Sequence, residues 1–130
     1  VSGGQAGNIH RPGDKQNFTA LLAELRRQLD GLGAGDGRHY QLTIAAPIGP
    51  SEYKNIELNA IGPYLDWINL MAYAFYTANS PMTNFNAPLY ASSTDPAAES
   101  KRLNLNADAA VKAYLAAGLP ANQLVLGVPF

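Results

Sequence analysis

The side chains best suited to chemistry are aromatic and amide residues that lie in or just after one apolar stretch of the chain. The stretch runs from Leu65 to Phe75, and the group consists of Met71, Tyr73, Phe75, Tyr76, Asn79, Asn84, Phe85, Asn86 and Tyr90. Aromatic rings cover the apolar faces of pyranose sugars, and amides form hydrogen bonds with sugar hydroxyl groups. The pattern is typical of a sugar site, but a loop that packs its own aromatic rings onto the protein accounts for it equally well.

Acidic and histidine residues do not form a catalytic set around this group. Hydrolysis usually requires a carboxylate pair, a nucleophile with its base, or a metal cluster. We interpret Asp66, at the start of the apolar stretch, as a structural acid; His39 precedes a predicted strand, and His10 lies in an opening loop. No metal-ligand pattern, phosphate loop or nucleophile elbow is visible, so the sequence predicts neither a metal site nor a cofactor.

The apolar stretch is interpreted as a strand buried on both faces of a parallel sheet. It is short, almost continuously apolar, and bounded by the turn signals Gly62-Pro63 and Asn79-Ser80-Pro81. A buried helix would show the same pattern, but Trp67, Ile68 and Phe75 favour a strand. In parallel α/β folds, ligands bind at the carboxyl ends of strands. The aromatic and amide group lies at that end.

The rest of the chain is predicted to alternate helices and strands. A loop is expected over 1–13, followed by a helix from Lys15 to about Leu32 that Asp14 caps and that Gly31, Gly33, Gly35 and Gly37 end. A strand over 40–47 and a short helix within 51–61 precede the apolar stretch, and a long loop over 76–104 follows it. The last expected elements are a helix over 107–115, with Gly118 at its C-cap, and a strand over 123–128. This order implies parallel crossover units. Because a whole barrel needs about 250 residues, we interpret the chain as the middle of one.

Composition limits the possible partners. The chain has 130 residues, 47% of them hydrophobic, which suits one packed domain at most. Its formal net charge is -1, which argues against nucleic acid and against an anionic membrane surface. No apolar run approaches the length of a membrane span, and the absence of Cys excludes a disulfide framework.

Six segments resemble, in order, glycoside hydrolase family 18, the chitinases of bacterial type. Trp67-Ile68-Asn69-Leu70-Met71-Ala72-Tyr73 is similar to the sixth-strand signature, Met-x-Tyr-Asp. The other five are residues 7–12 and 15–18, similar to the region after the fourth strand, 42–47, similar to the fifth strand, 85–90, similar to the sixth-strand loop, and 126–130, similar to the seventh strand.

The resemblance implies a fold and an activity. The fold is α/β, a partial TIM (β/α)8 barrel from after strand 4 through strand 7, with residues 1–130 as the incomplete central part of one catalytic domain. The parent protein, meaning the longer chain of which these residues would be a part, is expected to be a secreted monomer without a cofactor. It would hydrolyse β-1,4-N-acetylglucosamine linkages of chitin by substrate-assisted retaining catalysis.

The resemblance also assigns roles to residues. Tyr73 matches the tyrosine whose hydroxyl holds the acetamido group, and Met71 matches the methionine under the scissile sugar. The Asp that comes after this tyrosine in the family is replaced by Ala74. The implied substrate contacts are Met71, Ala74, Phe75, Tyr76, Asn84 and Phe85. Alternation along a strand would put Met71 and Tyr73 on one side and Ala72 and Ala74 on the other.

Two other interpretations stay open. Ala74 favours a chitinase-like lectin, a barrel that keeps the sugar groove without hydrolysis, and an unrelated α/β domain would explain the buried aromatic strand alone. For the isolated 130 residues we expect aggregation or a molten state, and no turnover of chitin oligomers. The reason is that a slice of a barrel leaves two apolar sheet edges without a neighbour.

The first prediction concerns the sequence upstream of Val1. In the family the fourth strand carries Asp-x-x-Asp-x-Asp-x-Glu, whose Glu is the general acid, and Val1 resembles the residue directly after this run. We therefore expect an acidic strand to end within a few residues of Val1 in the parent protein. Sequencing the parent gene checks this, and an upstream sequence without Asp-x-Asp-x-Glu would exclude the hydrolase interpretation.

Overall fold

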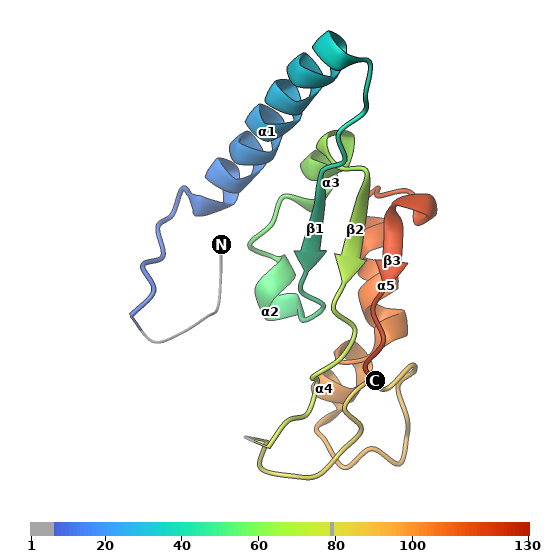
Figure 1. Ribbon diagram of the computed structural model, residues 1–130. Helices are drawn as coiled ribbons and strands as arrows, with labels where there is room; N and C mark the ends of the chain where they lie inside the picture. The colour runs from blue at the N-terminus through green and yellow to red at the C-terminus, as the bar shows by residue number, and fades with distance from the viewer. Residues whose placement is uncertain (1–6, 79) are drawn as a thin grey trace.

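The computed structural model describes residues 7–78 and 80–130, and in this part three parallel strands form one sheet. The strands are β1 (Thr43–Ala46), β2 (Trp67–Leu70) and β3 (Leu124–Leu126), in the order β1-β2-β3 (Figure 1). Ile68 of β2 lies opposite Ile44 of β1 and Leu124 of β3. The predicted parallel crossovers are confirmed. The predictions for Val1–Ala6 and for Asn79 lie outside the described residues.

Helical segments connect the strands and cover the sheet. They are α1 (Asp14–Asp36), α2 (Pro50–Tyr53), α3 (Leu58–Ile61), η1 (Gly62–Tyr64, a 3-10 helix), α4 (Glu99–Asn104), α5 (Ala107–Ala116) and η2 (Ala121–Gln123, also 3-10). Figure 1 shows α5 beside β3 and a long loop beyond the arrowheads. Within the described ranges, no helix has the length and apolarity to span a membrane, and no cluster of three His, Cys, Asp or Glu residues could hold a metal ion.

Helix α1 is longer than predicted. Gly31, Gly33 and Gly35 stay within the helix, and only Gly37, with a left-handed φ of 72°, ends it. The Gly37 N–H donates to the Gly33 carbonyl at 2.8 Å, a bond typical of a helix C-terminus. The predicted cap is also wrong: Gly13 is the N-cap, and Asp14 accepts a hydrogen bond from the Arg11 N–H.

The long loop both begins and ends earlier in the chain than predicted. Helix α4 occupies the last part of the predicted 76–104 loop, while β2 ends at Leu70. Glu99 in the first turn of α4, and Lys101 and Arg102 in its last turn, match the helix dipole. Charges of this kind carry no apolar period, so the hydrophobic pattern did not indicate this helix.

Buried apolar side chains join the sheet to α5. Ile68, Leu70 and Tyr114 are each at most 1% exposed. The Tyr114 hydroxyl donates to the Pro47 carbonyl just after β1, and its ring meets that of Tyr53 edge-on, with centroids 5.9 Å apart. Burial, with a smaller contribution from Tyr53, raises the pKa of Tyr114 well above the usual tyrosine range. Tyr114 thus stays neutral and locks α5 to the end of β1.

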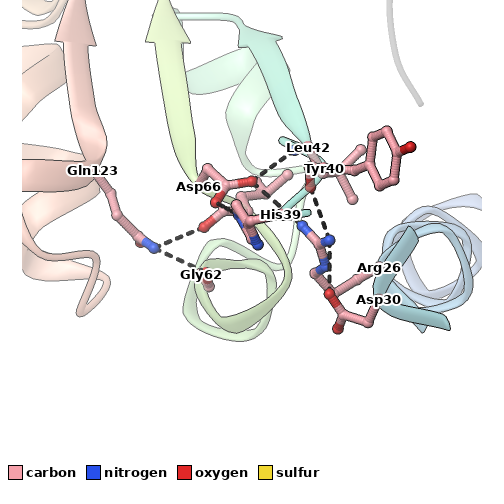
Figure 2. A network of polar contacts seen from close by, with 9 residues as sticks. Arg26, Asp30, His39, Tyr40, Leu42, Gly62, Asp66 and Gln123 are labelled. Atoms are coloured by element: carbon pink, nitrogen blue, oxygen red, sulfur yellow. Dashed lines mark hydrogen bonds and ion pairs between the residues drawn. The ribbon is translucent and has the colours of Figure 1, made fainter. Parts of the chain in front are cut away.

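Asp66 connects three segments at the amino end of the sheet (Figure 2). Its Oδ2 accepts hydrogen bonds from the Leu42 N–H at 2.7 Å and from Nη1 of Arg26, on α1, at 3.3 Å. Its Oδ1 pairs with Nε2 of His39. Arg26 also donates to the Tyr40 carbonyl at 2.8 Å. The carboxylate therefore fixes α1 and the segment before β1 against β2.

These contacts confirm that Asp66 is structural and that His39 lies at the end of the sheet away from the aromatic group. The Leu42 N–H, then His39, lower the pKa of Asp66, and these effects exceed the opposing effect of burial. Gln123 reinforces the same end, because its Nε2 donates to the carbonyls of Gly62 at 3.2 Å and Leu65 at 2.8 Å. Polar side chains at this end therefore serve stability.

The second prediction is that Asp66→Ala destabilises the parent protein by about 2–3 kcal/mol, because it leaves the half-buried Leu42 N–H without its acceptor and removes one of the acceptors of Arg26. The pKa of Asp66 is lowered in the folded state, so its stabilisation is complete above the unfolded pKa of about 3.9. The stabilisation is lost as the pH falls through the folded value. Thermal unfolding between about pH 7 and about pH 3 measures both effects.

Asp30→Ala is the matched control. Asp30 pairs with the same Arg26 at 2.7 Å, but its side chain is 61% exposed, so we expect a loss below about 1 kcal/mol. Equal melting temperatures for the two variants would contradict the role of Asp66. So would a difference between Asp66→Ala and the wild type that stays constant down to low pH.

Candidate functional site

The chain leaves β2 through two tight turns. The Met71 N–H donates to the Ala46 carbonyl at 3.0 Å, which extends the pairing with β1 by one residue. The Ala72 N–H then donates to the Leu70 carbonyl at 2.9 Å, and the Tyr73 N–H donates to the Met71 carbonyl at 2.8 Å. Hydrogen bonds between residues two apart close three-residue turns, which are common at strand ends. The backbone from Leu70 to Tyr73 therefore forms two successive three-residue turns.

The predicted strand over 65–75 is thus wrong at its carboxyl end. Beyond Met71 the N–H groups of Ala72 and Tyr73 bond locally rather than with a neighbouring strand, so strict alternation of side chains does not apply there. Ala72 is 3% exposed, whereas Ala74, predicted on the same side, is exposed. The turns present Met71 half-buried and Tyr73 exposed at the end of the sheet.

Ala74 has a left-handed backbone conformation, with a φ of 59°. Among the residues that the structure describes, it is the only non-glycine residue with a positive φ. This conformation costs about 1–2 kcal/mol for most L residues, and Asp and Asn adopt it more readily than Ala. The next residue, Phe75, donates its N–H to the Asn86 carbonyl at 3.0 Å. Position 74 is therefore the bend between the sheet and the loop.

Tyr73 lies against the end of β3. Its side chain is 37% exposed, and a methyl group on Gly127 would lie 3.0 Å from its Cε1. Its hydroxyl has no hydrogen bond with any other residue in 7–78 or 80–130. Tyr73 therefore offers a phenol group, supported on one side by backbone, at the carboxyl end of the parallel sheet.

Gly127 makes this arrangement possible. Its N–H donates to the Leu70 carbonyl at 2.8 Å, the same oxygen that accepts from Ala72. A methyl group at position 127 would lie only 2.6 Å from that oxygen. Any residue other than Gly would therefore separate β3 from β2 at the point where Tyr73 packs. Glycine inside a strand pattern can indicate such a close approach, and this signal could have identified Gly127 from the sequence.

Phe75 and Tyr76 face the loop and α4 rather than the end of the sheet. Both are half-buried and line a cavity of about 230 Å³ whose other walls include Met82, Ala97 and Lys101. Phe75 also packs against the hydrophobic core. The Tyr76 hydroxyl is buried without a hydrogen bond to a described residue, and burial, then the charge of Asp95, raises its pKa.

Asn84 and Phe85 take two further positions. The Asn84 side chain donates to Oδ1 of Asp95 at 2.7 Å and accepts from the Phe85 N–H at 2.8 Å, so it holds the loop. The Phe85 ring is 73% exposed. The structure thus places Met71 and Tyr73 just after the end of β2 and leaves Asn84 and Phe85 on the loop. Sequence reasoning missed Asp95, which carries no motif and acts through a contact 11 residues away.

Comparisons with known proteins agree on one family. The sequence profile of the family described as "Glycosyl hydrolases family 18" matches residues 3–130. Chitinase A1 from Niallia circulans is 46% identical over 100% of this chain and 19% of its own length. Chitinase ChiA74 from Bacillus thuringiensis superposes with a TM-score of 0.88 at 42% identity, over 96% of this chain and 20% of that chain. A class V chitinase from Nicotiana tobaccum, in complex with NAG4, superposes with a TM-score of 0.78 at 34% identity, over 95% of this chain and 34% of that chain.

The chain therefore belongs to glycoside hydrolase family 18, and its open α/β sheet is part of the TIM barrel of that family. The resemblance found in the sequence is confirmed. The chain spans about a fifth of the length of the bacterial relatives.

The third prediction is that Gly127→Ala destabilises the parent protein by about 1–3 kcal/mol, because its methyl group overpacks against the Leu70 carbonyl. Gly35→Ala is the control, since a methyl group at this helical position meets open space and removes a glycine from α1. We expect the control to be neutral or to stabilise by up to about 1 kcal/mol. Thermal unfolding compares the two, and a wild-type melting temperature for Gly127→Ala would contradict the close approach.

Proposed function

We propose that the parent protein is a chitinase that hydrolyses β-1,4-N-acetylglucosamine linkages. The observation that carries the proposal is Tyr73, whose phenol lies at the carboxyl end of the sheet with its hydroxyl unbonded to other described residues. Ligand sites of TIM barrels lie at that end. The match to family 18 and the chitinase relatives support the reaction type.

In this proposal the acetamido group of the substrate acts as the nucleophile. The Tyr73 hydroxyl donates a hydrogen bond to the acetamido oxygen and orients it toward the anomeric carbon. Met71, half-buried beside the turn, supports the sugar ring from below. Phe75 and Tyr76 shape the loop next to it. The general acid would come from the acidic strand expected upstream of Val1. It would protonate the oxygen of the leaving sugar as the acetamido oxygen bonds to the anomeric carbon and the glycosidic bond breaks. Water then opens the cyclised intermediate and releases the shorter oligosaccharide.

The proposed partner is chitin or its oligosaccharides. The relative from Nicotiana tobaccum, whose structure holds NAG4, supports this assignment. A secreted monomer without a cofactor completes the proposal, in keeping with the family resemblance.

A chitinase-like lectin is the second candidate, and Ala74 is the observation that favours it. Ala supplies neither the acceptor nor the charge that Asp provides at this place in the family. The φ of 59° at this position suits Asp better than Ala. Such a barrel would bind the acetamido group through Tyr73 and hydrolyse slowly.

The fourth prediction is that Ala74→Asp raises the turnover number of the parent protein on a chitin trimer at least tenfold, with a smaller change in affinity. Loss of one preorganised polar group of this kind typically costs on the order of 10²–10³ in turnover. Asp also fits the left-handed backbone at position 74 without new strain. Steady-state kinetics on both versions measure the effect.

Two variants make this experiment specific. Ala121→Asp adds the same charge at an exposed position of η2, at the amino end of the sheet, and we expect wild-type kinetics. Tyr73→Phe in the Ala74→Asp background removes the hydroxyl, and we expect the gained turnover to be lost. Equal rates for the wild type and Ala74→Asp would show that this barrel orients the acetamido group in another way. Trimer binding without turnover in both would favour the lectin.

A further inference from the structure

Asp95 interacts with both arms of the loop that follows β2, an outgoing arm over residues 75–78 and a returning arm over residues 84–90. On the returning arm, the Asn84 side chain donates from Nδ2 to Oδ1 of Asp95 at 2.7 Å. On the outgoing arm, burial, then the charge of Asp95, raises the pKa of Tyr76. The half-buried carboxylate therefore lies where the loop closes on itself.

Asn84 connects this carboxylate to the backbone near the sheet. Its side chain is half-buried, and its Oδ1 accepts from the Phe85 N–H at 2.8 Å. One residue further on, the Asn86 carbonyl accepts from the Phe75 N–H at 3.0 Å. The oxygen and the nitrogen of the Asn84 side chain thus both hold the start of the returning arm, which in turn bonds the residue after Ala74.

The bend at Ala74 depends on bonds on either side of it. Its φ of 59° is unfavourable for Ala, and such a conformation persists only where the surrounding structure fixes it. On the strand side, the Tyr73 N–H donates to the Met71 carbonyl, and on the loop side the Phe75 N–H donates to the Asn86 carbonyl. Tyr73 directly precedes the bend, so the place of its phenol depends on the place of Asn86.

Helices hold the outer ends of this series of bonds. Oδ1 of Asp95 also accepts from the Ala97 N–H at 2.8 Å, just before α4. The carbonyls of Pro88 and Leu89 accept from the first two N–H groups of α5, each at 3.0 Å. The returning arm therefore has two supports, Asp95 near its start and α5 near its end. Loss of the first support loosens the arm around Asn86 while α5 still holds the rest.

We propose that Asp95 and Asn84 are positioning residues that fix the Tyr73 hydroxyl for catalysis. This inference rests on the proposed function for the role of Tyr73. The pair acts through the Asn86 carbonyl and the bend at Ala74. Displacement of a reacting group by about 1 Å can cost about 10²-fold in rate. A loosened arm therefore lowers turnover, while the rest of the groove still binds the sugar chain.

The test breaks the pair by charge and restores it by exchange, in the parent protein. Asn84→Asp removes the donor and sets two carboxylates against each other, which repel. Asn84→Asp combined with Asp95→Asn exchanges the two side chains. An amide at position 95 donates to the carboxylate at position 84 and still accepts from the Ala97 N–H, and that carboxylate still accepts from the Phe85 N–H. Every hydrogen bond of the pair is thus available again.

Steady-state kinetics on a chitin trimer, well below the lowest Tm, give the readout. We expect Asn84→Asp to lower kcat about tenfold, with a much smaller change of KM, and the exchange to restore most of the loss. Tyr73→Phe combined with Asn84→Asp should keep the kcat of Tyr73→Phe alone, because the hydroxyl on which the pair acts is already absent. Thr94→Ala is the matched control, since it removes an exposed bond with Ser92 at 2.8 Å in the same loop, and it should keep the wild-type kcat.

Three results would overturn the proposal. A wild-type kcat for Asn84→Asp with a lowered Tm would mean that the pair only stabilises the fold. An exchange variant no better than Asn84→Asp would mean that the bond between the two side chains is not the cause. A further loss when Asn84→Asp is added to Tyr73→Phe would mean that the pair does not act through the hydroxyl.

Failure of the proposed chitinase activity is distinguishable from these results. It would appear as a wild-type protein that binds the trimer without hydrolysing it. The Kd for the trimer, from calorimetry, then tests the pair in place of kcat. A weaker Kd for Asn84→Asp that the exchange restores would support the positioning role, and equal Kd values for all three versions would overturn it.

Discussion

The carbonyl oxygen of Leu70 accepts two hydrogen bonds, and the geometry of the functional end depends on both. One bond, from Gly127, joins β2 to the end of β3, and the other, from Ala72, begins the turn that presents Tyr73. The oxygen can serve both N–H groups because residue 127 has no side chain. Sheet pairing and presentation of the phenol are thus a single constraint, so a change that separates the strands also moves Tyr73.

The two ends of the sheet have different tasks. At the amino end, Asp66 joins α1 and the segment before β1 to β2, and Gln123 bonds the turn before β2 to the start of β3. At the carboxyl end, the Tyr73 hydroxyl forms no hydrogen bond with another described residue, and Ala74 adopts a strained conformation. This division follows barrel architecture, in which one face serves stability and the other binds substrate. Strain at position 74 is held in place by the bonds on either side of it.

The loop after β2 separates its aromatic residues by anchoring its backbone. Phe75 and Tyr76 are half-buried where the loop folds back on itself: the Phe75 N–H donates to the Asn86 carbonyl, and Asp95, which is bonded to Asn84, lies near Tyr76. The same bonds leave Phe85 and Tyr90 facing outward. Composition alone cannot separate these two pairs, because the rings have the same chemistry and differ only in what their backbone contacts.

Local pattern determined much of this fold. Apolar period and turn residues identified α1, α5 and the three strands, and their alternation implied the parallel sheet. Asp66 was recognised as structural because its place before β2 put it at the stabilising end of the sheet. The packed structure decided the rest: β2 ends at Leu70 in local turns, Tyr73 lies against Gly127, and Asp95 closes the loop on Asn84. Periodicity reports which face of an element is buried, but only the packed chain brings together partners that lie tens of residues apart.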